Sequence, residues 1–194
     1  MEHYFRSVPG WAAFADLYVD VVQRAPQDGA RFVEVGSWLG RSAALMGVEI
    51  HNSGKKIEFV CVDPWTDGGP DLRDTGYFKN LTEPVYDQFI RNITPVAQHI
   101  RALRMPSVEA SRWFPDRSVD FIMLDGDHNY DGIRDDISAW LPKMKVGAMM
   151  TGDDYGWPGV KRAVDETFGK RVEVVWKKRH ANYKNSSSYW GVLT

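Results

Sequence analysis

The chain has 194 residues, of which 43% are hydrophobic and 26% are charged, and its formal net charge is -2. This length fits one domain, and this composition excludes a largely disordered chain and leaves no general attraction to nucleic acid or to an anionic membrane. No stretch of the chain approaches the ~18 apolar residues that a membrane-spanning helix needs.

Helical and strand-like patterns alternate along the chain. In chain order, apolar spacing and turn residues predict a helix over 11–24, a strand over 31–35, a helix over 42–50, a strand over 57–62, a lid loop over 66–81, a helix over 84–93, strands over 99–103 and 119–124, a helix over 130–144, a strand over 147–151, a helix over 159–168, and strands over 171–176 and 189–193. This order predicts an α/β fold, with a Rossmann-like, mostly parallel seven-stranded sheet, an antiparallel C-terminal hairpin and helices on both faces.

In such sheets, ligands bind at the carboxyl ends of the strands. Glycine or acidic residues follow four of the predicted strands, as Gly36, Asp63, Asp125 and the pair Asp153-Asp154. We therefore expect these residues to share one rim of the sheet.

The segment 34–40 lies between a predicted strand and a predicted helix and has the pattern G-x-x-x-G, with the bulky Trp38 inside it. A dinucleotide site would have G-x-G-x-x-G, and the G-K-[ST] of a Walker loop is missing. Asp63 would end the second strand, where a carboxylate can accept hydrogen bonds from both ribose hydroxyls. Together these features favour a nucleoside with a cationic amino-acid end as ligand; the alternative is a tight turn without a ligand.

Four segments carry a resemblance to known proteins. Residues 33–42 and 60–63 resemble the first two motifs of class I S-adenosylmethionine-dependent methyltransferases. Residues 121–130 and 152–155 resemble a bacterial subfamily that includes macrocin-type sugar O-methyltransferases and cephalosporin hydroxylase-like proteins. The resemblance covers most of the chain, from about residue 8 to its end.

The resemblance implies that S-adenosylmethionine is the methyl donor. Its methionine part would be surrounded by Glu34, Gly36, Ser37 and Gly40, with Ser42 and Asp125 also near the donor. Asp63 would hold the ribose, and Ser107 and Val108 would lie beside the adenine. The loop 104–107 departs from the commoner pattern of the class, because it has no acidic residue.

Asp125, Asp153 and Asp154 follow two strands that we expect to be neighbours. Hard cations such as Mg²⁺ take carboxylate oxygens, and the resembled O-methyltransferases place a divalent ion at these three positions. The alternative is that these aspartates cap the helices that follow them.

His128 lies three residues after Asp125 and is the candidate general base, with Asp125 as the second candidate catalytic residue. A helix cap or a structural hydrogen bond is the alternative role for the histidine. Five aromatic residues are candidates for either a pocket wall or the core: Trp11, Trp65, Tyr77, Tyr155 and Trp157. The pair Asp135-Asp136 is expected on the exposed face of a helix.

These features predict an S-adenosylmethionine-dependent methyltransferase that methylates a hydroxyl of a small molecule or sugar with the help of Mg²⁺ or another divalent cation. The alternative is a donor-binding or hydroxylase-like protein of the same fold without methyl transfer. The single cysteine, Cys61, cannot form an intrachain disulfide, and the first residues lack the apolar core of a signal peptide. We therefore expect one cytoplasmic domain over 1–194, without a membrane or nucleic-acid partner, and homo-oligomer formation stays open.

Overall fold

The computed structural model describes residues 1–66, 83–177 and 187–194. The strands are β1 (Asp28–Val35), β2 (Lys56–Asp63), β3 (Ile100–Arg104), β4 (Val119–Leu124), β5 (Met144–Gly152), β6 (Glu173–Lys177) and β7 (Ser187–Leu193). The helices are η1 (Phe5–Ser7), α1 (Ala15–Arg24), α2 (Arg41–Ser53), α4 (Val85–Ile93), η3 (Thr94–His99), α5 (Ser107–Ser111), α6 (Tyr130–Trp140), η4 (Leu141–Lys143), α7 (Pro158–Phe168) and η5 (Gly169–Arg171). Of the predicted lid 66–81, all but Thr66 lies outside the described residues.

The strands form one sheet in the order β3-β2-β1-β4-β5-β7-β6. Strands β1 to β5 are parallel, and β7 pairs antiparallel with both β5 and β6. This arrangement confirms the predicted Rossmann-like sheet and its C-terminal hairpin. The strand order reverses between β1 and β4, which is the switch point where open α/β sheets bind their ligands.

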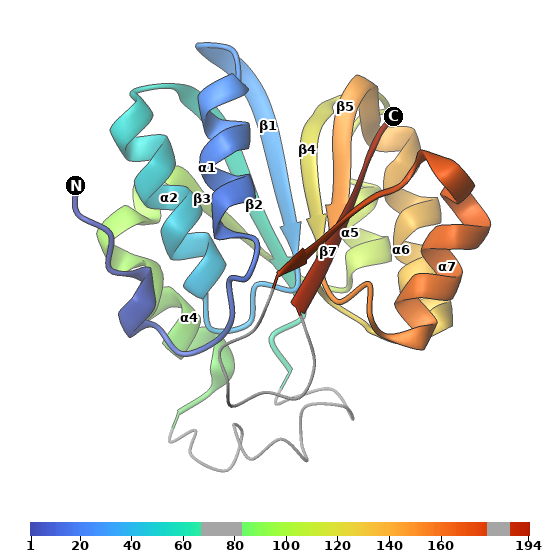
Figure 1. The fold of residues 1–194 in the computed structure, drawn as a ribbon. Coiled ribbons are helices and arrows are strands. Elements are labelled where there is room, and N and C mark those ends of the chain that lie inside the picture. Colours follow the sequence, from blue (N-terminus) through green and yellow to red (C-terminus); the bar gives the residue numbers. More distant parts are fainter. Residues whose placement is uncertain (67–82, 178–186) are drawn as a thin grey trace.

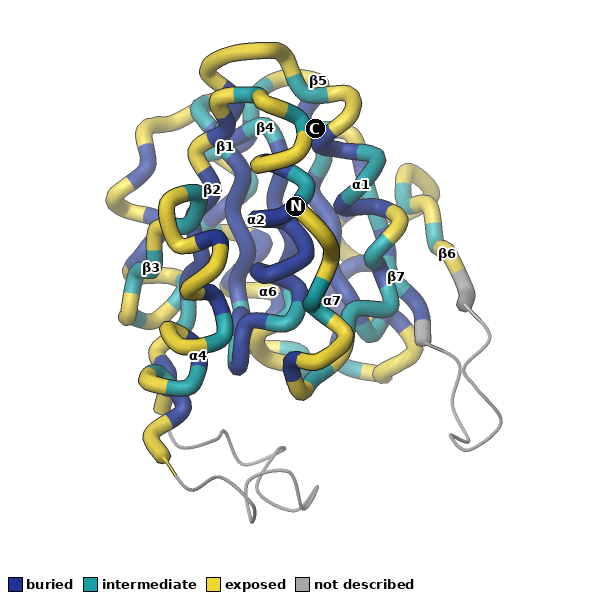
Figure 2. The backbone as a smooth tube through the Cα atoms, turned by 90° about the vertical axis from the view of Figure 1, so that its left-hand side faces the viewer, coloured by how far each residue is buried: buried dark blue, intermediate teal, exposed yellow. Residues whose placement is uncertain are grey.

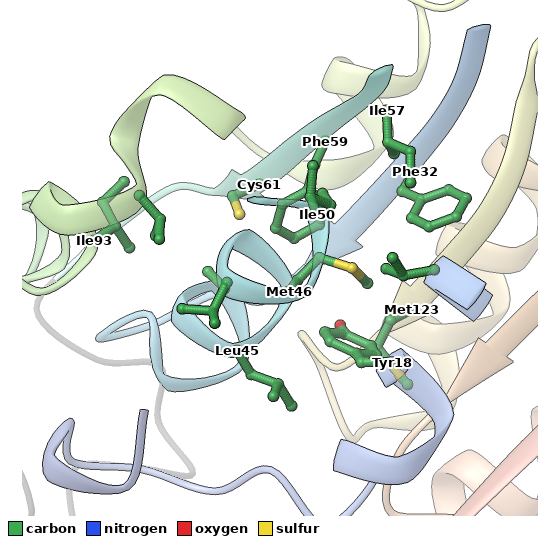
Figure 3. Close-up of a cluster of buried hydrophobic side chains, with 14 of the residues drawn as sticks. Tyr18, Phe32, Leu45, Met46, Ile50, Ile57, Phe59, Cys61, Ile93 and Met123 are labelled. Carbon is green, nitrogen blue, oxygen red and sulfur yellow. The ribbon is translucent and has the colours of Figure 1, made fainter. Parts of the chain in front are cut away.

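Alternation along each strand divides the core into two layers. Phe32, Phe59 and Met123 point to the face that α1, α2 and α4 cover, and Figure 3 shows this cluster. Val60 and Ile122 point to the opposite face, which is covered by α5, α6 and α7 (Figure 1). In Figure 2 the backbone of α2 and of the second half of β1 is largely dark blue, which marks buried residues. Among the described residues, no helix has the length and apolar character that crossing a bilayer would require.

Two predicted helices have different bounds in the structure. The helix expected over 130–144 ends at Trp140, because Pro142 is placed in the following 3-10 turn and Met144 already begins β5. The helix expected over 11–24 begins only at Ala15. The short α5 was not predicted at all, since five residues are too few to show a helical period.

The expectation that Asp136 lies on an exposed helix face is wrong. Its side chain is buried between α6 and α5, where it shares a hydrogen bond with Ser107. Trp140 Nε1 donates to the same Ser107 hydroxyl at 2.9 Å, so this hydroxyl joins the two helices. Burial, together with the charges of Asp127 and Asp135, raises the pKa of Asp136 to about 6 against the opposing hydrogen bond from Ser107.

This raised pKa predicts a pH-dependent stability. The folded protein binds the Asp136 proton more tightly than the unfolded chain, so the stabilisation is present at low pH and is lost as the pH rises through about 6. In Asp136→Asn, the side chain stays neutral and can still accept from Ser107. Between pH 5 and pH 8, the wild type should lose on the order of 1 kcal/mol relative to this variant, measured by urea denaturation. If the difference in unfolding free energy between the wild type and Asp136→Asn does not change with pH, the raised pKa of Asp136 is contradicted.

Candidate active site at the carboxyl ends of β1, β2, β4 and β5

Backbone hydrogen bonds tie the loops after β1, β4 and β5 to the end of a neighbouring parallel strand. Gly36 N donates to Val62 O at 2.9 Å, and Asp125 N donates to Val35 O at 2.9 Å. Asp153 N donates to Leu124 O at 3.2 Å. The arrowheads of β1, β4 and β5 accordingly point to one end of the sheet in Figure 1. The sequence-predicted residues at these strand ends therefore lie along one rim.

Gly36 is the point where the β1 loop crosses the β4 loop. Its φ is +87°, and a Cβ on this residue would lie 2.0 Å from the carbonyl oxygen of Asp125. No side chain fits there, because the obstructing atoms belong to the backbone. The need for glycine at this position comes from the crossing loop, in addition to any approach by a ligand.

Glu34 lies at the centre of a buried polar group beneath this loop. Its Oε2 accepts a hydrogen bond from the Tyr18 hydroxyl at 2.6 Å, and the buried side chains of Ser37 and Ser42 lie near the carboxyl group. Burial raises the pKa of Glu34, while the hydrogen bond from Tyr18 acts in the opposite direction. Tyr18 on α1 was not identified from the sequence, because its position in the chain shows only that it belongs to the apolar stripe of a helix.

Gly40 ends the same loop in the left-handed region, with φ +84°, and begins α2. A Cβ here would come within 2.9 Å of the Phe89 ring on α4. This glycine therefore lets α4 pack against the start of α2, and the loop 36–40 is held from both sides.

The Asp63 carboxylate organises two loops. Its Oδ2 accepts from Trp38 N at 2.9 Å and its Oδ1 accepts from Trp65 N at 2.6 Å. Both tryptophans have positive φ, 41° and 43°, and Trp65 Nε1 donates to Trp38 O at 2.8 Å. Asp63 thus stabilises two unfavourable backbone conformations beside the position where we expect the ribose. Burial raises its pKa despite these backbone hydrogen bonds.

The two residues predicted beside the adenine differ in exposure. Ser107 begins α5 and its hydroxyl is engaged by Trp140 and Asp136, as described above. Val108, the second residue of α5, is exposed. The structure thus places a fixed hydroxyl and an open apolar side chain next to each other at this end of the sheet.

Asp125, His128 and Asp154 converge across the β4 and β5 loops. Their ligand atoms all lie within 4.8 Å of one another. His128 Nε2 lies 3.0 Å from Asp154 Oδ2 and 4.0 Å from Asp125 Oδ1. Asp153 is buried beside them and does not belong to this group of atoms. Among the described residues, the convergent set therefore consists of two of the three predicted aspartates and the histidine.

Negative charge accumulates around Asp125. Burial raises the pKa of Asp125 well above its ordinary value, and Asp153, Asp154, Glu34 and Asp63 raise it further, in that order. A cation at this position would relieve the repulsion among these carboxylates. Carboxylate oxygens suit a hard divalent ion such as Mg²⁺, and an imidazole nitrogen is also a ligand for transition metals. The donor set therefore fits a divalent cation.

One exposed tryptophan contacts the acidic group, and another contacts the β1 loop. Trp157 lies against His128, with ring centroids 5.1 Å apart and an interplanar angle of 34°. Trp11 stacks on Trp38 with ring centroids 5.3 Å apart. Of the five aromatic candidates, Trp11 and Trp157 are exposed, Trp65 and Tyr155 are buried, and Tyr77 lies outside the described residues.

A family model described as a methyltransferase domain matches residues 33–155, which include both β–α loops and the acidic group. No curated protein matches the chain by sequence.

Several solved structures share the fold. The O-methyltransferase NovP superposes with a TM-score of 0.65 at 19% identity, over 94% of this chain and 80% of NovP. TomG, an O-methyltransferase of tomaymycin synthesis from Streptomyces achromogenes solved with S-adenosylmethionine, has a TM-score of 0.61 at 14% identity, over 96% and 82% of the two chains. CalS11, a TDP-rhamnose 3'-O-methyltransferase of calicheamicin biosynthesis, has a TM-score of 0.54 at 16% identity, over 90% and 76%. At these identities, the likeness shows the fold.

Proposed function

The chain belongs to the methyltransferase-domain family, and from this membership we propose that it transfers a methyl group from S-adenosylmethionine to a hydroxyl of a small molecule or sugar, assisted by a divalent cation. The observation that carries this proposal is the convergence of Asp125, His128 and Asp154 at the switch point of the sheet, beside the Gly36 loop. A donor bound along the loops of β1 and β2 would present its methyl group toward this convergence.

Methyl transfer from a sulfonium is an in-line displacement, so the protein mainly has to hold donor and acceptor in line and remove the proton of the acceptor. The loops around Gly36 and Asp63 are rigid enough to hold a donor, because hydrogen bonds and close backbone contacts fix them. The TomG complex with S-adenosylmethionine supports the choice of donor.

His128 is the proposed general base. An alcohol has a pKa far above neutrality, so a neutral imidazole alone is a weak match for its proton. A divalent cation bound by Asp125 and Asp154 would lower the pKa of a nearby hydroxyl. His128 would then collect the proton, and the Asp154 carboxylate, whose Oδ2 lies 3.0 Å from His128 Nε2, would stabilise the imidazolium that results. Asp153 would support the cation through its charge.

Two of the related structures have names that point to small molecules, which supports this class of acceptor, whereas the name of another refers to an rRNA-methylase. CalS11 acts on TDP-rhamnose, and TomG belongs to the synthesis of tomaymycin. An exposed tryptophan beside a group of carboxylates also suits an acceptor that has both an apolar face and hydroxyl groups.

The test is calorimetry with S-adenosylhomocysteine, followed by incubation with methyl-labelled donor, Mg²⁺ and a library of hydroxyl compounds. We expect binding and a labelled ether product. Binding without any product would favour the alternative, a donor-binding protein that keeps the fold without methyl transfer. Absence of binding would contradict the donor assignment itself.

Asp63→Ala should weaken S-adenosylhomocysteine binding by about 30- to 150-fold, which corresponds to the loss of about 2–3 kcal/mol of hydrogen bonds to a charged group. Part of this loss comes from the ribose and part from the freed backbone of Trp38 and Trp65. Calorimetry with an analogue that lacks both ribose hydroxyls separates the two parts. The wild type should bind the analogue more weakly than S-adenosylhomocysteine. The Asp63→Ala variant should bind the two compounds about equally well. If removal of the ribose hydroxyls weakens binding equally in the wild type and in the variant, Asp63 holds the two loops but does not bind the ribose.

A further inference from the structure

Trp157 occupies a turn that the rest of the fold holds in place. Its N–H donates to the carbonyl of Asp154 at 2.8 Å, and Pro158 begins α7 directly after it. The two residues between them bond to β7: Tyr155 N donates to Ser188 O at 3.2 Å, and Gly156 N donates to Ser188 Oγ at 3.0 Å. The position of the Trp157 backbone is therefore linked to that of Asp154.

The first turn of α7 also packs against the loop of His128. A Cβ on Gly159 would lie 2.7 Å from the His128 carbonyl oxygen and 2.7 Å from Tyr130 N, so only glycine allows this approach. The close contact places the Trp157 ring next to the His128 imidazole, at the 5.1 Å centroid distance given above. The backbone that carries the indole is thus held by two sets of contacts. The first turn of α7 packs against the His128 loop, and residues 155 and 156 hydrogen-bond to β7.

Trp157 nevertheless remains 48% exposed. Exposure alone does not mark a site, since Trp113 is 65% exposed and the structure records no ring contact between it and His128 among the described residues. Trp157 differs because its exposed apolar ring lies directly beside His128, which in turn contacts Asp154. An apolar surface and a group of hydrogen-bond acceptors therefore meet at one edge.

This juxtaposition matches a particular kind of ligand. A ring with an apolar face can lie on the indole and gain the energy of aromatic stacking or of C–H contact. A hydroxyl at the edge of the same ring would then reach toward His128 and the carboxylates. Pyranose rings and catechol-like rings share this chemistry, because both have an apolar face and hydroxyl groups in the plane of the ring edge.

We propose that Trp157 is the platform on which the acceptor ring lies, and that the acceptor is a ring compound with an apolar face and a hydroxyl at its edge. The inference rests on the proposed function, since it assigns the acceptor side of that reaction. It makes Trp157 a specificity-determining residue of this chain and limits the acceptors to ring hydroxyls.

The test uses the full chain with S-adenosylhomocysteine and Mg²⁺, and two probes, methyl rhamnopyranoside and catechol. Binding is measured by saturation-transfer NMR for the wild type, Trp157→Ala and Trp157→Phe, with Trp113→Ala as the matched control. We expect at least one probe to bind the wild type, and Trp157→Ala to weaken it by about 10-fold. Trp157→Phe and Trp113→Ala should stay within about 3-fold of the wild type. The probe that shows this dependence identifies the ring as a sugar or an aromatic.

Turnover of the same probe distinguishes a platform from a residue that only positions His128. Loss of a platform raises KM and leaves kcat nearly unchanged, whereas a misplaced base lowers kcat with KM unchanged. The second pattern would overturn the proposal, as would a wild type that binds S-adenosylhomocysteine but neither probe, or equal probe binding by Trp157→Ala. Failure of the wild type to bind S-adenosylhomocysteine would instead contradict the proposed function.

Discussion

Excess chelator should abolish methyl transfer while S-adenosylhomocysteine binding largely survives, and Asp154→Ala should have the same effect. The reason is electrostatic. Burial and four other carboxylates raise the pKa of Asp125, and a bound divalent cation would stabilise the charged form of this carboxyl group. Without the cation, the pKa of the acceptor hydroxyl stays far above that of an imidazole, and the proton cannot leave at a useful rate. The measurement is initial rate against added metal after chelation, with calorimetry for the donor.

Asp154→Asn is the informative companion of this variant. Asp154 has a φ of 53°, a conformation that Asn tolerates better than Ala, and the amide oxygen remains a ligand for a hard cation. This variant should therefore retain part of the activity and need more metal. Asp131→Ala is the matched control, because Asp131 is an exposed acid that pairs with Arg134. Asp127 is a less suitable control, since its carboxylate accepts from Asn129 in the loop of His128.

His128→Ala distinguishes the two roles that the histidine can take beside Asp154. As the general base, its loss should lower turnover by about 10²- to 10⁴-fold, with the affinity for the metal nearly unchanged. As a ligand, its loss should shift the metal requirement, and added metal should restore the rate.

Full activity in excess chelator would contradict the role of the cation in the reaction. The aspartates would then be helix caps or donor contacts.

Gly36→Ala should destabilise the fold by on the order of 3 kcal/mol or more, since it combines the cost of a left-handed backbone with a collision that no rotamer relieves. The added Cβ would lie 2.0 Å from the Asp125 carbonyl oxygen and 2.4 Å from the carbonyl carbon. Relief therefore requires the β1 and β4 loops to separate, which would disturb the convergent residues as well. The measurement is the free energy of unfolding in urea.

Gly54→Ala supplies the matched control for this collision. Gly54 also has a positive φ, +65°, but a Cβ there would meet nothing within 4 Å. Its replacement should cost only the left-handed conformation, about 1–2 kcal/mol. Equal losses in the two variants would show that the crossing of the β1 and β4 loops relaxes freely and does not require a glycine.

Features that depend on neighbours in the chain were predictable from the sequence. The apolar run 119–124 is a strand with those same bounds, because alternation and β-branched or aromatic content act within a few residues. The alternation of such runs with helical patterns led to the parallel sheet, and the rule that ligands bind at strand ends led to the rim that contains Gly36, Asp63 and Asp125. The confirmed family extends the same local motifs, since its match covers the loops after β1, β2, β4 and β5.

Contacts between distant segments were decided only by the tertiary structure. His128 and Asp154 are 3.0 Å apart because β4 and β5 pair in register and α7 packs closely at Gly159, and no local pattern contains that information. Asp136 is a second residue whose surroundings the local sequence did not predict. Its position beside Asp135 in an amphipathic helix suggested exposure, but the helix turns it toward Ser107 on α5, an element too short to predict.

The sequence by itself thus determined the fold class, the methyltransferase motifs and the residue types at the rim, since these are written in local periodicity and in the chemistry of single side chains. The tertiary structure decided which of those side chains meet, which are buried with raised pKa values, and that Trp157 lies beside the candidate base with its ring exposed. The physical reason is that burial and proximity depend on the packing of whole elements, and packing is set by contacts between residues far apart in the chain.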